Sequence, residues 1–127
     1  MPDREILNFP SYWFRSEPDI AKPSLTPVFG DCVTWSVLPL STNSPARDLY
    51  SDLTSSPGQT AIARYTIARH GARGTAQRSM SVQPGEPLGS WVNNLVLYDG
   101  HVAGVKLDRL WEYYWHKQWE PPATRPR

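Results

Sequence analysis

The chain has 127 residues with 13 Lys and Arg, 12 Asp and Glu, and a formal net charge of +1. This length suits one domain and is too short for two, and the balanced charge excludes binding of a polyanion by the whole surface, so an electrostatic partner would need a local patch. The single cysteine, Cys32, excludes an internal disulfide. With 6 Trp, 6 Tyr and 3 Phe, aromatic rings are expected to supply much of the core.

The N-terminal stretch MPDREILNF carries acidic residues where a secretory signal would be basic, and no apolar run follows it. No window reaches the ~18–20 apolar residues that a membrane span needs. The sequence therefore predicts a soluble intracellular protein without membrane contact, in the cytoplasm or in a virion assembled there. Cysteine and histidine do not cluster at metal-ligand spacing, so we expect no metal and no cofactor.

Prolines punctuate residues 1–29, at Pro2, Pro10, Pro18, Pro23 and Pro27. Because proline removes a main-chain donor and holds the preceding residue extended, a long helix is excluded here. We expect an extended arm with short strands over Glu5–Phe9 and Tyr12–Ser16. Such an arm would pack on its own domain or reach a neighbouring subunit.

Residues 12–19, with the sequence YWFRSEPD, resemble the opening strand of EVE domains. Those domains begin with Tyr-Trp, two variable residues and then Lys-Ser-Glu-Pro. The resemblance covers eight residues, and the Trp- and Arg-rich segment that follows in that family is missing here. It implies a PUA-like β-barrel that accommodates modified nucleobases.

The segment Cys32–Leu40 alternates apolar and polar residues with the period of a β-strand. Two further segments look like strands: Thr60–Arg69 and Thr75–Val82. The last two flank a turn over residues 70–74, in which two glycines supply positive φ values. Between the first two lies a long polar connection, residues 41–58, with one possible helical turn after Ser44. The repeated short strands predict antiparallel pairing.

The strongest local signal is the Asp-Gly pair at the centre of Trp91–Leu107. Two residues of this kind between apolar runs are typical of a hairpin with a type I′ turn. That turn would place Leu97 opposite Val102 and Val96 opposite Ala103. Both faces of the ribbon carry apolar side chains, so we expect the hairpin to lie deep in a sheet.

The segment after the hairpin fits two periods. A helix capped by Asp108 would align Trp111, Trp115 and Trp119 on one face, whereas a strand would align Trp111, Tyr113 and Trp115. We favour a short helix that ends before two prolines, followed by an extended tail over residues 120–127. The three tryptophans either cover the core as a lid or form an exposed platform that binds a partner.

Four arginines, Arg64, Arg69, Arg73 and Arg78, fall in residues 61–80, which contain no acidic residue. Their planar guanidinium groups suit a phosphate, nucleic-acid or acidic-partner contact. The alternative is a solvated hairpin tip whose arginines pair with Asp48, Asp52 or Glu86. His70, His101 and His116 are interpreted as surface or interface residues, because no second ligand or catalytic partner stands at a recognised spacing.

The sequence predicts a mainly β fold, a small antiparallel barrel or two-layer sandwich with one short C-terminal helix. Its organisation would be a Pro-rich arm with short strands (1–29), a β core (30–119) and a tail (120–127). No residues stand out as catalytic, and the favoured function is a non-enzymatic binding or assembly protein, such as a subunit of a virion, phage tail or other large complex, with protein partners or self-assembly. The alternatives are a nucleic-acid or phosphate-binding β-barrel module and a small enzyme with an aromatic pocket.

Overall fold

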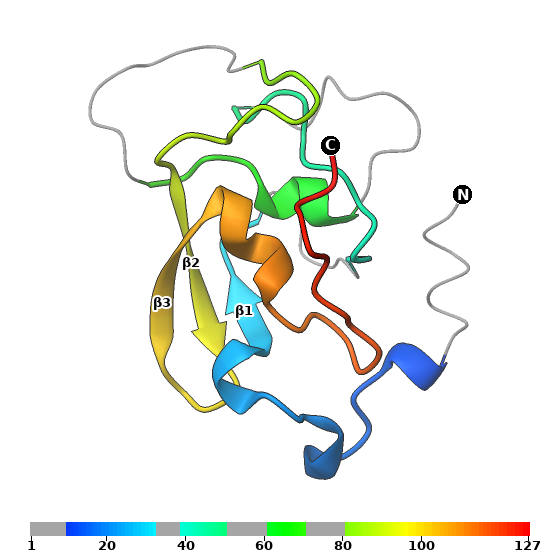
Figure 1. Ribbon diagram of the computed structural model, residues 1–127. Coiled ribbons are helices and arrows are strands. Elements are labelled where there is room, and N and C mark those ends of the chain that lie inside the picture. The colour runs from blue at the N-terminus through cyan, green and yellow to red at the C-terminus, as the bar shows by residue number, and fades with distance from the viewer. Residues whose placement is uncertain (1–9, 33–38, 51–60, 71–80) are drawn as a thin grey trace.

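A computed structural model of the chain describes residues 10–32, 39–50, 61–70 and 81–127 (Figure 1). Its strands are β1 (Pro27–Gly30), β2 (Val92–Leu97) and β3 (Val102–Lys106). Five short 3-10 helices accompany them: η1 (Pro10–Tyr12), η2 (Glu17–Asp19), η3 (Pro23–Leu25), η5 (Ala61–Tyr65) and η6 (Leu107–Glu112).

The three strands form an antiparallel sheet in the order β1-β2-β3. Together with the scarcity of helix in the described ranges, this sheet confirms a mainly β structure. The sheet is open, and its three strands do not close into a barrel. Of the other strands expected from the sequence, residues 5–9, 33–38 and 75–80 lie outside the described residues.

The predicted hairpin is confirmed, but its turn type and register were wrong by one residue. Val96 pairs with Val102 and Leu95 with Ala103. The Gly100 N–H donates to the Leu97 carbonyl and the Leu97 N–H to the His101 carbonyl, both at 2.9 Å, which makes a three-residue loop. Gly100 alone in this loop has a positive φ, +93°, so a type I turn followed by a left-handed glycine replaces the type I′ turn.

The two faces of the sheet differ, so the expectation of a hairpin buried on both sides was wrong. Asn93, Leu95 and Leu97 of β2 are at most 1% exposed, and helix η6 lies in front of this inner face (Figure 1). The core that forms between them and the neighbouring segments contains Leu49, Ile62, Val82, Leu88, Leu95, Leu97, Val105, Leu107, Leu110, Trp111 and Trp119. The opposite, outer face carries the exposed residues.

The strand expected over Thr60–Arg69 is replaced by helix η5 and an extended stretch that bridges His70 to Val92. Four residues of this segment are at most 1% exposed: Ile62, Ala63, Thr66 and Ile67. Their i, i+1, i+4, i+5 spacing is that of a helical turn. The Thr66 hydroxyl donates to the Ala63 carbonyl at 2.8 Å and accepts the Ala46 N–H at 2.9 Å. The first bond is local and the second joins residues far apart in the chain, and together they hold the turn that replaces the expected strand.

The C-terminal helix is shorter than expected, because η6 ends at Glu112 and Tyr113 is extended. The Tyr114 N–H then donates to the Leu25 carbonyl at 2.8 Å, a tertiary bond that a continuing helix would not allow. Asp108 does not cap the helix. Its carboxylate instead accepts the Leu88 N–H at 3.0 Å.

The described part of the N-terminal arm packs along the C-terminal segment and the hairpin. The Lys117 N–H donates to the Tyr12 carbonyl at 2.9 Å, and Lys117 Nζ pairs with Asp19 at 2.8 Å. The strand expected over Tyr12–Ser16, which the resemblance to EVE domains also implies, is absent: η1 ends at Tyr12, η2 begins at Glu17, and residues 13–16 between them form no strand. The expected boundary between arm and core, residues 29 and 30, falls inside β1, which spans Pro27–Gly30.

Candidate partner-binding surface

The outer face of the sheet presents a row of apolar side chains across all three strands. Phe29 pairs with Val96, and Val96 pairs with Val102, so the three side chains point to the same side. Phe29 is 78% exposed and Val102 63% exposed, while Val96 is partly buried between them. We call these three residues the outer row.

The inward direction of Gly30 fixes the outward direction of Phe29. A Cβ atom on Gly30 would lie 2.5 Å from the Leu95 side chain, which is fully buried on the inner face. Because successive residues of a strand point to opposite faces, Phe29 must face out. The core thus leaves no room on the inner side for a large residue at the end of β1.

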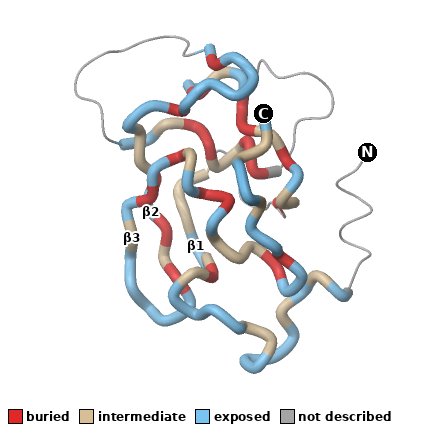
Figure 2. Tube along the Cα trace, in the orientation of Figure 1, coloured by how far each residue is buried: buried red, intermediate tan, exposed pale blue. Residues whose placement is uncertain are grey.

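Strand β3 is one edge of the described sheet and is mostly exposed along its length (Figure 2). The alternation of an antiparallel pair directs the main-chain groups of Val102, Gly104 and Lys106 away from β2. This edge lies directly beside the outer row. Lys106 carries the only charge within β3, at the end of the strand farthest from Val102.

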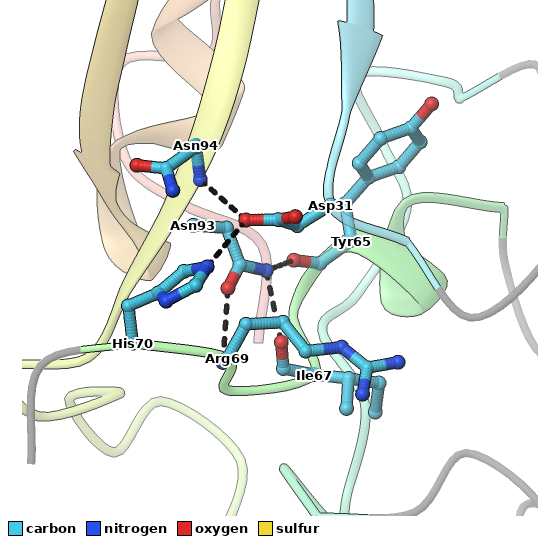
Figure 3. Close-up of polar contacts among 7 residues, drawn as sticks. All are labelled: Asp31, Tyr65, Ile67, Arg69, His70, Asn93 and Asn94. Atoms are coloured by element: carbon cyan, nitrogen blue, oxygen red, sulfur yellow. Dashed lines mark hydrogen bonds and ion pairs between the residues drawn. The ribbon is translucent and has the colours of Figure 1, made fainter.

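On the inner face of the sheet, a buried asparagine binds the main chain of a neighbouring segment (Figure 3). Asn93 is fully buried, and its Nδ2 donates to the carbonyls of Tyr65 at 2.6 Å and Ile67 at 2.8 Å. Its Oδ1 accepts the Arg69 N–H at 3.0 Å. These three bonds attach the end of η5 and the segment after it to the beginning of β2, which fixes β2 as a base for the outer row.

A second polar contact attaches the end of β1 to β2. The Asp31 carboxylate accepts the Asn94 N–H at 2.8 Å and pairs with His70 Nε2 at 2.9 Å. The two side chains are 33% and 51% exposed, so the pair is solvated. An Asp–His pair can hold an imidazole as a general base, but its observed partners are structural, and we assign it a positioning role.

The side chain of Tyr65 lies under the same corner of the sheet. Its ring packs against Trp115 with 4.5 Å between centroids, and one edge lies 3.4 Å from the position of a Gly30 Cβ. Burial raises the pKa of the Tyr65 hydroxyl to about 12, with a smaller contribution from Cys32. The phenol therefore stays neutral and acts as part of the packing.

Of the four arginines predicted to form a basic contact, the structure describes two, and Arg73 and Arg78 lie outside the described residues. Arg64 is half-buried on η5, and Arg69 is exposed. The Arg69 guanidinium points away from the Asp31 carboxylate (Figure 3). The basic contact of the four arginines therefore stays a prediction.

The three tryptophans lie together around η6 although no helix aligns them. Trp111 and Trp119 are 2% and 3% exposed, and Trp119 Nε1 donates to the Trp111 carbonyl at 3.1 Å. Trp115 is half-buried and donates to the Leu110 carbonyl at 2.8 Å. This packing corresponds to the aromatic lid, and only Trp115 keeps a part of its ring at the surface for a partner.

The three histidines occupy different environments, and His116 was wrongly expected at the surface. It is 4% exposed, between the rings of Tyr12 and Trp119. His101 is exposed and pairs with Asp99 in the hairpin loop at 2.5 Å. Across residues 10–32, 39–50, 61–70 and 81–127, no three His, Cys, Asp or Glu side chains gather where they could hold a metal ion.

Phe29 and Val102, the most exposed members of the outer row, were not singled out by sequence reasoning. Within PVFG, the alternation alone does not say which side is open, because that depends on the pairing with β2 sixty residues later. The available signal was Gly30: a residue without a side chain beside a large aromatic marks the aromatic as the one that faces out.

Comparisons of the chain with protein-family models, with curated protein sequences and with solved structures gave no match. Within the described residues, no helix is both long and apolar enough to cross a membrane.

Proposed function

We propose that this protein is a non-enzymatic binding or assembly protein, a small structural subunit of a virion, phage tail or other large complex, and that the outer row docks on a second copy of this chain. The observation that carries the proposal is the exposure of Phe29, 78%, in line with Val96 and Val102 across an ordered sheet. Docking on this face would add the second layer that a two-layer sandwich requires.

Isolated exposed apolar residues are common on soluble proteins, whereas aligned ones on a flat, rigid surface are typical of interfaces. An exposed aromatic side chain such as Phe29 is a usual energetic anchor of a protein contact. The neighbouring edge of β3 adds main-chain donors and acceptors, which an incoming strand can pair with. The apolar anchor Phe29 and the open edge of β3 thus favour a protein partner over a small molecule.

The test is the mass in solution measured by light scattering, for the wild type and for Phe29→Ser. We expect self-association of the wild type to rise with concentration and to be lost in the variant, with unfolding unchanged because the side chain is outside the core. Tyr50→Ser is the matched control, since this aromatic residue is also exposed, at 54%, and lies outside the sheet. A wild type that stays monomeric, or a variant that associates equally, contradicts the proposal.

The alternative function, a nucleic-acid-binding module, is not proposed as a second candidate. Its predicted contact needs Arg64, Arg69, Arg73 and Arg78 on one surface, and the described residues place only Arg69 in the open. The same light-scattering measurement with added nucleic acid distinguishes the two functions. A complex that weakens steeply with salt would favour the alternative.

A further inference from the structure

Near the C-terminal end of the described chain, the side chain of Arg125 lies in a site formed by residues of the domain. Arg125 is 12% exposed at its side chain, and its Nε pairs with Asp108 at 2.8 Å. Its Nη2 donates to the Glu86 carbonyl at 2.6 Å. The guanidinium also lies over the Trp111 ring, 5.7 Å from the centroid. A carboxylate, a carbonyl and an aromatic face together match what a guanidinium binds best.

The receptor side of this site belongs entirely to the body of the domain. Trp111 is in the core, and the Asp108 carboxylate is held in place by the Leu88 N–H through its other oxygen. The Glu86 carbonyl is in the tight turn before Leu88, closed by the Glu86 N–H to the Gln83 carbonyl at 3.0 Å. The site is therefore preorganised and can receive an arginine from its own chain or from another one.

The tail contacts the body through Arg125 and through the side chain of Arg127, which lies against Gly85. Trp119 is the last core residue, and residues 120–124 make no hydrogen bond to any other described residue. A hollow of about 400 Å³ remains between tail and body, lined by Gly85, Pro87, Asp108, Thr124, Arg125 and Arg127. Because a hollow lies beneath the tail and few of its side chains contact the body, the tail loses little packing when it detaches.

The segment between the two anchors has the length and composition of a transferable arm. Five residues separate Trp119 from Arg125, and when extended they reach roughly 17 Å. Pro121 and Pro122 keep the arm stiff and extended, which lowers the entropy that it loses on docking elsewhere. In a neighbouring copy the tail would make the same contacts with the same residues. This identity of contacts is the condition for exchange of a segment between identical chains.

We propose that the cleft formed by Asp108, the Glu86 carbonyl and the Trp111 ring is an arginine receptor through which copies of this chain link by exchanging residues 120–127. The proposal rests on the proposed function in that copies of the chain meet in an assembly. It names a second contact, separate from the outer row. In the single chain, Arg125 closes the receptor; in the assembly, the tail of a second copy takes its place.

The test mixes two complementary variants, both in a Phe29→Ser background so that the outer row does not contribute. The receptor copy carries Arg125→Ala and keeps an empty cleft. The donor copy carries Asp108→Asn, which keeps an acceptor for the Leu88 N–H but removes the charge that holds Arg125. Neither variant can link to itself by exchange, whereas the mixture can, so we expect a 1:1 complex by native mass spectrometry in the mixture only.

A peptide measurement checks the receptor without relying on the donor variant. The full-length Arg125→Ala copy is titrated with a labelled peptide of residues 120–127 and its fluorescence anisotropy is followed. We expect binding that falls at least tenfold when the peptide arginine at 125 is replaced by Lys, and that stays within about twofold when the exposed Arg127 is replaced by Ala.

Absence of a complex in the mixture, or a peptide that binds equally well without its arginine at 125, overturns tail exchange. These outcomes leave the outer row untouched, because its own test compares the wild type with Phe29→Ser. Conversely, a monomeric wild type contradicts docking by the outer row, while the mixed variants still decide whether the tail can be exchanged.

Discussion

Replacing His116 by Phe isolates the effect of one buried imidazole on stability. The ring lies between Tyr12, at 4.6 Å between centroids, and Trp119, at 5.3 Å. Its Nδ1 accepts the Gln118 N–H at 3.2 Å, and Nε2 is buried without a hydrogen-bond partner among the described residues. Adding a proton would place a charge among these rings and would turn Nδ1 from an acceptor into a donor that faces another donor.

Burial lowers the pKa of His116 from 6.5 to about 4. The unfolded chain therefore takes up the proton more readily than the folded chain, so the stability that this group contributes is complete above pH 6.5 and falls between pH 6.5 and 4. Each pKa unit corresponds to ~1.4 kcal/mol, which makes the loss about 3 kcal/mol at pH 4.

The assay is urea unfolding of the wild type and of His116→Phe at a series of pH values from 7 to 4. Phe keeps the ring packing and does not titrate, so groups common to both proteins cancel in the difference between their free energies of unfolding. The Asp19 carboxyl, for example, has its pKa lowered by the hydrogen bond from Lys117 and titrates below this window. The wild type should lose about 3 kcal/mol relative to the variant as the pH falls. A difference that stays constant from pH 7 to 4 would refute the reasoning.

Two further predictions concern the inner face of the sheet. Asn93→Leu should lower the free energy of unfolding by about 2–4 kcal/mol, because one buried and two partly buried main-chain groups lose their partner. Asn94→Ala, on the exposed face next to it, should change it by less than ~0.5 kcal/mol, and equal losses by urea unfolding would contradict the role of Asn93. Gly30→Ala should cost about 1–3 kcal/mol, since the new methyl would meet the buried Leu95 at 2.5 Å. An unchanged midpoint in thermal unfolding of that variant would show that Leu95 has room to move.

The part of the fold that could be predicted from the sequence is the part fixed by neighbours in the chain. The hairpin around Gly100 is local, and its existence followed from two apolar runs and a turn. Its register did not follow, because Asp-Gly suits both a two-residue loop and the observed three-residue loop, in which only Gly100 has a positive φ. That single residue of difference decides that Val96 pairs with Val102 rather than with Ala103.

Segments whose structure depends on distant partners were predicted poorly. Residues 61–67 were expected to belong to a strand, but their bonds to Ala46 and Asn93 stabilise a helical turn. The aromatic stripe has helical spacing, yet the bond from Tyr114 to Leu25 ends the helix early. The tail was expected to be extended, and only the positions of Asp108 and Trp111 in space show why Arg125 holds it on the domain.

The candidate surface was less predictable still, for a physical reason. Exposure of Phe29 is a property of the pairing between β1 and β2 and of the crowding at Gly30, neither of which is visible in four residues of sequence. By contrast, the general expectation of an aromatic core was sound, since Trp111 and Trp119 are both in it.

The pairing of β1 with β2 also has a consequence for folding of the protein during its synthesis on the ribosome. Asp31 and its hydrogen-bond partner Asn94 are 63 positions apart, so the first strand leaves the exit tunnel long before its neighbour has been translated. Until then Val28 and Phe29 have no sheet to join, and contacts of such long range form slowly. Nascent chains of this protein should therefore bind chaperones at β1, and should release them only when the hairpin has emerged.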